Sequence, residues 1–571
     1  MAAPKGGDDV QLNTDVLVIG AGGAGMSAAL AAAGRGVEVI LADRSLIGRG
    51  GATIMAQMTV AAAIGEEVAD DPSHHFADTM AAGRGLCDAS LAALVCEQGP
   101  EAIRQLDEWK VGWARGPDGR IRQTQAPGHD RPRCVYVDFL STGPAVAKTL
   151  RSRVMRQGAI TRIGDFYVTD LVIRDGEAQG AVGFSVTDGR PVAIAAGSVV
   201  LATGGLTKLY RRNSASANMG GDGHALALRA GAELMDMEFV QFFPIGHLAP
   251  RLVGMDPIMW DPFRYKLGGR LLNAERQEFI NDYGNDEGTT YVVTRDKATY
   301  AILREVQAGR GSPAGGAYLS FEHVPEEKLR AAFGPVIDRL ADNGIDLTRM
   351  PVEVAPIAHY HMGGVRVTAT LETRVPNLFA AGELVSGSNG ANRLSGNAIT
   401  EAAVFGRKAG EEAARRALSR RGRMTVGFGR GELELVRATG DGSAHPHAAM
   451  VADLQGVMAD MVGPFRSKEG LECALERLEG IKRAMGEEPL DAPGSFLTSR
   501  LDWFDLRSML PAAEAITRAA LMRTESRGAH QREDFPGLDS AWTFHQSVAL
   551  VGGGMTLGHV PVEGERIPQV A

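Results

Sequence analysis

Cysteine is scarce in this sequence, with only four residues among 571, at positions 87, 96, 134 and 473. No two of them have the C-x-x-C spacing, whereas iron–sulfur clusters are held by sets of cysteine thiolates at short, regular spacings. A cluster within this chain is therefore excluded. Isolated cysteines are typical of reduced thiols in a cytosolic protein. We interpret Cys87, Cys96 and Cys134 as small buried hydrophobes.

The sequence also lacks a basic excess, a long apolar run and an export signal. Its 60 Lys and Arg residues are outnumbered by 69 Asp and Glu, which gives a formal net charge of -9 and argues against nucleic acid as a partner. No run of about 18 apolar residues occurs, so no membrane span is predicted. The first residues, MAAPKGGDDVQL, contain neither an apolar core nor a twin arginine. We expect a soluble, cytoplasmic protein.

Glycine, by contrast, is abundant, and its most informative cluster lies near the N-terminus. Residues 14–19 (TDVLVI) form an apolar strand pattern, residues 20–25 (GAGGAG) a glycine turn before a small-residue helix, and residues 36–43 a second strand that ends at Asp43. This order is the context in which G-x-G-x-x-G binds a dinucleotide, with the pyrophosphate at the helix N-terminus and an acid on the ribose. The alternative is a glycine-rich packing turn. The motif does not separate FAD from NAD.

The patterns change along the chain in a way that predicts several domains. Apolar strands recur at 198–205 and 377–383, short mixed elements occupy about 241–354, and helical periodicity dominates 402–421 and 449–527. These patterns divide the chain into segments at 14–240 and 356–421 with strand and glycine signals, a segment of mixed elements between them at 241–355, a linker at 422–448, a helical segment at 449–530 and a tail at 531–571 that is expected to wrap the surface.

A series of later motifs resembles one family throughout the chain, from Thr14 to Trp542. The motifs are R-G-G-A-T at 49–53, LATGG at 201–205, G-D-G at 221–223, MEFVQFFP at 237–244, HYHMGG at 359–364, LFAAGE at 378–383, NGANRLSGN at 389–397 and RTESRGAHQRED at 523–534. In this order they resemble the flavoprotein subunits of fumarate reductase and succinate dehydrogenase, and L-aspartate oxidase. The resemblance implies FAD and an α/β fold, with a Rossmann-like FAD-binding domain in two parts (14–240 and 356–421), an inserted α+β capping or substrate domain (241–355) and a C-terminal helical domain (449–530).

The expected cofactor site follows these motifs. Glu383, at a strand end, is placed to accept from ribose or ribityl hydroxyls, and the helix that opens at Gly396 is expected to stabilise negative charge on the reduced flavin. Succinate dehydrogenases attach FAD through a histidine whose position is Ala52 here, so the resemblance implies non-covalent FAD. The predicted cofactor-binding residues are Gly20, Gly22, Gly23, Ala24, Gly25, Asp43, Arg44, Gly51, Ala52, Thr53, Gln57, Ala202, Thr203, Gly204, Asp222, Glu383, Asn392, Arg393, Gly396, Asn397, Ala398 and Ile399.

The substrate motifs both match the family and depart from it. His359 and Arg393 match two of the residues that clamp a dicarboxylate in the family, and Tyr360 is grouped with them. The histidine of Q-F-H-P-T is Phe243 here, and the histidine of H-G-A-N-R-L is Asn389. An apolar or aromatic part of the substrate is expected against Phe242, Phe243 and Trp260.

The proton-transferring arginine of the family's R-G-E-G-G motif falls at Tyr265, with Arg264 one residue before it. Tyr265 is interpreted either as a general acid or base or as a core tyrosine that fills the space of the arginine, and both readings stay open. The predicted catalytic residues are Tyr265, Arg264, His359 and Arg393.

The predicted activity is FAD-dependent hydride transfer to or from an anionic small molecule other than succinate or fumarate. One alternative is an adenylylsulfate-reductase-like flavoprotein with a separate iron–sulfur or ferredoxin-like electron-transfer subunit. The other is a flavin-binding subunit without catalytic activity. No metal site is predicted: the adjacent His74 and His75 do not face the same way on a helix and are interpreted as a surface pair, and His359-x-His361 lacks a third ligand.

Overall fold

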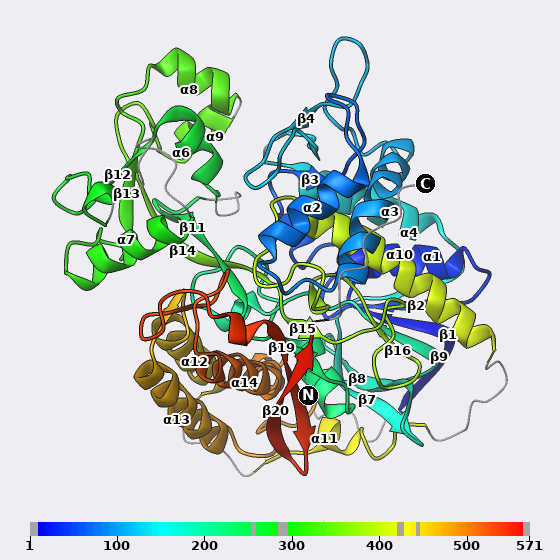
Figure 1. The fold of residues 1–571 in the computed structure, drawn as a ribbon. Coiled ribbons are helices and arrows are strands. Elements are labelled where there is room, and N and C mark those ends of the chain that lie inside the picture. The colour runs from blue at the N-terminus through cyan, green and yellow to red at the C-terminus, as the bar shows by residue number, and fades with distance from the viewer. Residues whose placement is uncertain are drawn as a thin grey trace. The chain divides into compact units, whose positions relative to one another are not determined.

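The computed structural model describes residues 9–138, 140–252, 258–283, 295–334, 336–419, 428–440 and 446–562, without the side chains of Pro262, Tyr265, Lys266, Arg295 and Asp296. The chain forms two compact units (Figure 1). Unit 1 consists of Met1–Arg211, Ala215–Val240 and Tyr360–Ala571, and unit 2 of Arg212–Ser214 and Gln241–His359. The helical segment that we expected as a separate domain belongs to unit 1.

Unit 1 is built on a seven-stranded sheet whose strand order is β6-β2-β1-β9-β8-β7, with β16 also paired to β9. The strands β6, β2, β1, β9 and β16 are parallel, and β7 and β8 add an antiparallel edge. Residues 16–19 of β1 are buried without alternation, as expected for a strand covered on both faces. The strands are β1 (Val10–Ile19), β2 (Val39–Ala42), β6 (Ile160–Ile163), β7 (Phe166–Arg174), β8 (Glu177–Ser185), β9 (Pro191–Leu201) and β16 (Leu378–Ala380).

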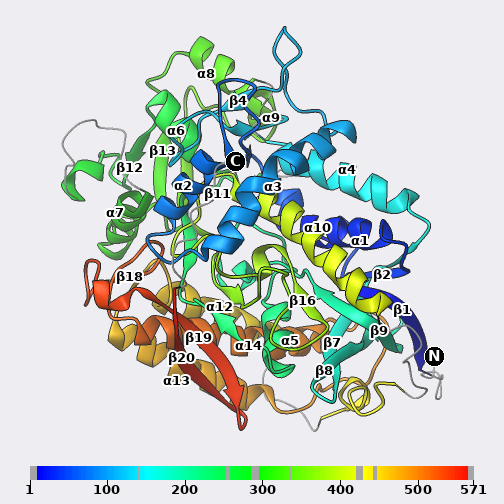
Figure 2. The same cartoon turned by 45° about the vertical axis from the view of Figure 1, so that its right-hand side comes forward.

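Two helices, α1 (Gly23–Ala33) and α10 (Asn397–Leu418), pack closely against each other, and both views show them side by side (Figures 1 and 2). The contact depends on glycines in α10. A Cβ atom on Gly406 would lie 2.3 Å from the carbonyl oxygen of Ala24, and one on Gly410 would lie 2.2 Å from that of Ala28. No side chain fits at either position, so the two helices meet backbone to backbone.

Smaller elements complete unit 1. Its other helices are α2 (Pro72–Ala82), α3 (Ala89–Glu108), α4 (Thr142–Arg156), α5 (Asp222–Arg229), α11 (Glu434–Arg437), α12 (His447–Met461), α13 (Lys468–Met485) and α14 (Thr498–Met522). Its small sheets are formed by β3 (Val60–Ala61), β4 (Gln123–Thr124) and β5 (Cys134–Val135), and by β17 (Phe465–Arg466) and β18 (Gln531–Arg532). Cys87, Cys96 and Cys134 are free and buried, as predicted. No helix in the described ranges is long and apolar enough to cross a membrane.

The C-terminal tail lies largely at the surface, since residues 533–541 are exposed and residues 554–561 are exposed or half-buried, but it also contributes strands to unit 1. Its described part forms the hairpin β19 (Phe544–Val551) and β20 (Gly554–Pro561), and β19 pairs with β10 (Leu234–Met235), which in turn pairs with β15 (Gly364–Val365). Gln546 is fully buried and its side chain donates to the Glu238 carboxylate at 2.8 Å. The tail is therefore an integral strand pair of unit 1.

Unit 2 contains a sheet with the order β11-β14-β13-β12, in which β12, β13 and β14 pair antiparallel, and its described part holds four α-helices. The elements are β11 (Val240–Ala249), α6 (Asp261–Leu267), β12 (Arg270–Leu272), α7 (Arg295–Gln307), β13 (Ala317–Ser320), α8 (Glu326–Phe333), α9 (Val336–Asp342) and β14 (Val352–His361). An aromatic cluster forms its core.

Trp260 lies at the centre of this cluster, with its ring 5.9 to 6.2 Å from the rings of His247, Phe263, Phe321 and Phe333. Its indole N–H donates to His247 Nδ1 at 3.1 Å, and the residue is fully buried. Trp260 is thus a core residue of unit 2, which removes it from the candidates for contact with substrate.

Candidate functional site

The glycine turn between β1 and α1 combines tight packing at its ends with open space in its middle. Gly20 has φ +103, and a Cβ there would lie 2.4 Å from the carbonyl oxygen of Ala202, while a Cβ on Gly25 would lie 1.8 Å from that of Gly20. A Cβ on Gly22 would meet nothing within 4 Å. Gly22 is also the N-cap of α1 without a side-chain hydrogen bond, and the first turn holds no acid. The start of α1 is therefore a cradle open to a phosphate group.

Asp43 stabilises this turn. Its carboxylate accepts from the N–H of Ala21 at 2.6 Å and from the N–H and hydroxyl of Ser45, both at 2.8 Å. Burial raises the pKa of Asp43, and these hydrogen bonds oppose the increase. Asp43 thus connects the end of β2 to the glycine turn, and its predicted contact with a ribose hydroxyl stays a prediction.

Arg44 and Asp222 belong to a buried ion cluster. Arg44 Nη1 lies 3.0 Å from Asp222 and 2.8 Å from Asp505 of α14, and Lys208 Nζ lies 2.5 Å from Asp505. The Arg44 guanidinium also lies 4.7 Å from the centre of the Tyr167 ring. Asp505 was not predicted, because nothing in its helical surroundings indicates a partner more than 400 residues earlier. The cluster joins a segment of the expected helical domain to the predicted cofactor residues.

Glu383 is a buried carboxyl group with few protein partners. Its Oε1 accepts from the N–H of His361 at 3.2 Å, and burial raises its pKa to about 8. A Cβ on Gly205 would lie 2.2 Å from that oxygen, so a larger residue there would displace the Glu383 side chain. A buried carboxyl group of this kind fits hydroxyl groups of a ligand, as the ribose and ribityl chain of FAD would supply.

The predicted residues at the start of α10 are arranged around Gly396, which has φ +86 and is the N-cap of the helix without a side-chain hydrogen bond. Asn397 is buried, and its amide group is bonded to His75 Nε2 at 2.8 Å and to Thr79 Oγ1 at 3.2 Å. The Asn397 side chain is therefore directed at protein, and the backbone N–H groups of the first turn are what the helix offers to a ligand.

Three further predicted residues lie at the short helix η1 (Thr53–Met55). Ala52 is its half-buried N-cap, Thr53 Oγ1 accepts from the N–H of Gly23 at 3.1 Å, and the N–H of Gly51 donates to Ser216 at 2.8 Å. Thr53 thereby connects η1 to the start of α1.

Arg393 lies in unit 1 above an aromatic ring. Its guanidinium carbon is 4.4 Å from the centre of the Tyr360 ring, and the residue is 6% exposed. The Tyr360 hydroxyl donates to Glu401 Oε1 at 2.9 Å, and Ser388 donates to Glu401 Oε2 at 2.9 Å. The guanidinium is thus held over a ring whose hydroxyl is anchored, which restricts its position, and two-point carboxylate binding benefits from a positioned guanidinium.

Asn389 differs from its predicted role in substrate binding. It is 3% exposed, and its amide N–H groups donate to Ser388 Oγ and Glu401 Oε2. Asn389 therefore belongs to the buried network around Glu401, which the sequence did not indicate.

In unit 2, His359 and Phe243 are neighbours. His359 Nδ1 lies 2.8 Å from Ser214 Oγ, and its ring centre lies 5.3 Å from that of Phe243 in an edge-to-face arrangement. Phe243 packs with Met259 and Ile357. The surroundings of His359 are therefore apolar on the Phe243 side.

The other predicted catalytic residues of unit 2 lie in α6. Arg264 is 2% exposed, and so is Asp261, three residues before it, which was not predicted. Residues at this spacing lie on the same face of a helix. Tyr265 also belongs to α6, but its side chain lies outside the described part of the structure.

Together, the open glycine cradle, the buried carboxyl group of Glu383 and the uncapped start of α10 fit FAD, and the fold and site define an FAD-dependent oxidoreductase. The family models agree: the FAD binding domain matches residues 15–399, and the fumarate reductase flavoprotein C-terminal region matches residues 451–570. The chain belongs to the fumarate reductase and succinate dehydrogenase flavoprotein family. The predicted family, fold class, cofactor and enzyme class are confirmed.

Known relatives are similar along nearly their whole length. The chain is 36% identical over 531 residues to a subunit of the CoM/CoB fumarate reductase of Methanothermobacter marburgensis, covering 92% of this chain and 95% of the relative. It is 32% identical over 548 residues to L-aspartate oxidase of Streptomyces coelicolor, covering 94% and 91%. Among solved structures, Sdh1 of Mycobacterium smegmatis is 33% identical with a TM-score of 0.88, covering 97% of this chain and 95% of that one. Adenylylsulfate reductase of Archaeoglobus fulgidus, 20% identical over the full length of both chains with a TM-score of 0.76, shares the fold.

Proposed function

We propose that this flavoenzyme transfers hydride between flavin N5 and a small molecule with one carboxylate or similar anionic group and an apolar remainder. Bound FAD supplies the two-electron chemistry. The family resemblance assigns an anion contact to Arg393 and, separately, a substrate contact to His359, and a proton donor or acceptor acts on the carbon next to the one that exchanges hydride. In the oxidative direction, the substrate loses a proton to the protein and a hydride to the cofactor.

The observation that carries this proposal is Phe243. The family resemblance implies a histidine donor at this position for a second carboxylate, and here a phenyl ring packs with Met259, Ile357 and the His359 ring. A phenyl ring provides no hydrogen bond to a desolvated carboxylate. Asn389, at the other replaced histidine, donates its amide hydrogens to Ser388 and Glu401. One anionic contact with an apolar neighbour therefore fits these residues better than a dicarboxylate clamp.

We propose Arg264 as the proton-transferring residue. It lies in α6 and is 2% exposed. In the motif match, the family's proton-transferring arginine aligns with Tyr265. This proposal gives its role to the preceding residue, Arg264.

We expect poor turnover of succinate and fumarate. Losing one charge-assisted contact costs about 1.5–3 kcal/mol, which corresponds to roughly ten- to a hundredfold in rate when the contact tightens in the transition state. The measurement is anaerobic flavin reduction by succinate, and fumarate reduction by the dithionite-reduced enzyme, beside a panel of aliphatic and aromatic monocarboxylates. Turnover of many per second with succinate or fumarate would show that the dicarboxylate clamp is intact.

We also expect the FAD to be bound without a covalent link, because Ala52 offers no nucleophile at the position of the linking histidine. Acid precipitation should release all flavin into the supernatant, and the denatured chain should show no flavin fluorescence in a gel. Flavin that stays with the denatured chain would contradict this expectation.

We further propose that electrons reach the flavin through a separate iron–sulfur or ferredoxin-like subunit. Relatives of this chain are described as subunits. Burial raises the pKa of Cys96 and of Cys134 to about 12, which leaves both as inert thiols rather than cluster ligands. Copurification of the tagged protein from its own host tests this proposal, and a fully active single-chain enzyme with a soluble acceptor would argue against it.

A further inference from the structure

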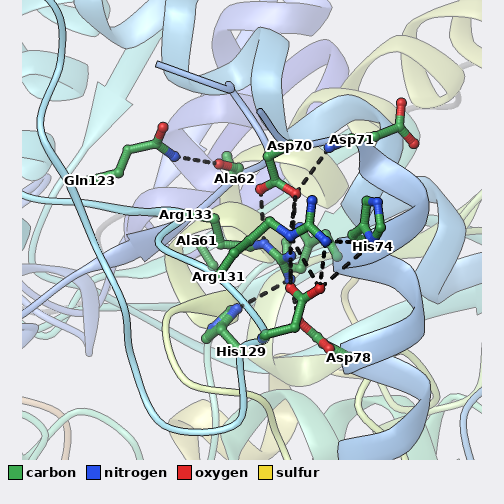
Figure 3. Close-up of polar contacts among 12 residues, drawn as sticks. Ala61, Ala62, Asp70, Asp71, His74, Asp78, Gln123, His129, Arg131 and Arg133 are labelled. Atoms are coloured by element: carbon green, nitrogen blue, oxygen red, sulfur yellow. Dashed lines mark hydrogen bonds and ion pairs between the residues drawn. The ribbon is translucent and has the colours of Figure 1, made fainter. Parts of the chain in front are cut away.

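A buried ion cluster lies beside the start of α10, formed by Asp70, Asp78, His129, Asp130 and Arg133 (Figure 3). We call it the Arg133 cluster. The side chains of Arg133 and Asp70 are fully buried, while that of Asp130 is 39% exposed. All of these residues belong to unit 1.

The guanidinium of Arg133 uses each of its five N–H groups within the cluster. Nε donates to Asp70 at 3.0 Å and Nη2 to Asp70 at 3.2 Å. Nη2 also donates to Asp130 at 2.6 Å, and Nη1 donates to Asp78 at 2.6 Å and lies 3.3 Å from His129 Nδ1. Since a guanidinium has five donors and no acceptor, Arg133 has no group left for a ligand. Its role is to orient the groups around it.

These contacts determine the tautomer of His129. Arg133 can only donate, so His129 Nδ1 must accept, and the ring proton of the neutral imidazole must be on Nε2. Nε2 lies 2.7 Å from the carbonyl oxygen of Ser395 and therefore donates to it. Burial lowers the pKa of His129, which favours this neutral form.

Ser395 directly precedes Gly396, the N-cap of α10, and two other contacts hold the same turn. The N–H of Ala61 donates to the carbonyl oxygen of Gly396 at 3.0 Å, and His75 bonds to the Asn397 side chain at 2.8 Å. The backbone carbonyl groups of Ser395 and Gly396 thus accept hydrogen bonds from protein groups. The helix has no side-chain hydrogen bond at its N-cap, and its first turn contains no acidic residue.

We propose that His129 is a positioning residue for flavin reduction: the Arg133 cluster orients its ring, and His129 Nε2–H holds the Ser395 carbonyl and thereby the N-terminal turn of α10. The inference depends on our assignment of this turn to the flavin, where it stabilises the negative charge that develops on reduction. It does not depend on the identity of the substrate.

The test compares His129→Leu with His129→Gln in the FAD-loaded full chain. A glutamine amide can donate from near the position of Nε2, whereas leucine cannot. We expect the leucine variant to reduce the equilibrium constant for two-electron reduction about tenfold, which is about 30 mV more negative in midpoint potential, and the glutamine variant to recover most of this shift. Equilibration with redox dyes measures the potential without any substrate, so failure of the proposed substrate class leaves this result unaffected.

His74→Leu is the matched control. His74 is 47% exposed, and its Nδ1 lies 3.0 Å from Arg131 Nη2 at the edge of the same cluster (Figure 3). The His74→Leu variant should have the same flavin midpoint potential as wild type. Equal potentials in wild type and His129→Leu, or equal shifts in the leucine and glutamine variants, would overturn the proposal. If the leucine variant is isolated without FAD, His129→Asn takes its place, because the shorter amide does not reach Ser395. Equal midpoint potentials for the Asn and Gln variants would then overturn the proposal.

Discussion

Arg264→Gln is expected to lower turnover with the true substrate by about 10²–10⁴-fold, the usual contribution of a positioned proton-transfer group. Glutamine keeps hydrogen-bonding capacity but removes the charge. Arg264 is 2% exposed, so no bulk water replaces the lost proton donor or acceptor. We expect the loss mainly in kcat, because the interaction belongs to the transition state rather than to substrate binding. Steady-state kinetics and single-turnover flavin reduction measure it.

Tyr265→Phe is the matched control, because the two residues are adjacent in α6. Successive positions of an α-helix differ by about 100° in direction, so the two positions lie on different faces of the helix. If Arg264 transfers the proton, the phenylalanine variant should stay within a fewfold of wild type. The reverse pattern would assign the role to Tyr265 and restore the direct match to the family motif.

Arg393→Lys is expected to lower kcat/KM by about 10²–10³-fold although the charge is kept. Lysine cannot reproduce the planar pair of donors that binds a carboxylate at two points. It also loses most of the stacking on Tyr360, where the guanidinium lies 4.4 Å from the ring centre. The two losses together correspond to about 3–4 kcal/mol when each is near the upper end of its usual range.

Tyr360→Phe is the control for Arg393→Lys, because it leaves both the guanidinium and the ring beneath it in place. The ring under Arg393 remains, and only the hydroxyl donor to Glu401 is lost. We expect a small effect on KM and a normal flavin spectrum. Unchanged turnover in Arg393→Lys would show that Arg393 is structural and that the anion binds elsewhere.

The parts of this molecule that are predictable from sequence are those in which neighbouring residues act together. The strand, glycine turn, helix and second strand from Thr14 to Asp43 contain the whole argument for a dinucleotide within about thirty residues, and the structure places an open cradle at Gly22. The motif order along the chain was sufficient for the family and for FAD. Glu383 was identifiable because it follows a short buried strand.

The features that escaped prediction depend on contacts between distant segments. Asn389 looked like a substrate residue because a histidine stands there in the family, but its partner Glu401 and the hydroxyl of Tyr360 come from two other elements. The hairpin β19–β20 looked like a surface tail because glycines interrupt it, yet it pairs with β10, about 310 residues earlier. Arg44 has an acid partner on α14 that no local pattern predicts. Long-range pairing of this kind is decided by burial and charge compensation in the folded chain.

The division of the chain into two units has a consequence for how its substrate range can evolve. Nearly all the residues assigned to FAD lie in unit 1, whereas Phe243, Arg264 and His359 lie within residues 241–359 of unit 2, a single continuous stretch of the gene. Mutations in that stretch can accumulate without disturbing the nucleotide cradle or the glycine contacts between α1 and α10. Descendants of one ancestral flavoprotein can thus acquire new substrates by revising an insert of about 120 codons while inheriting the redox machinery unchanged.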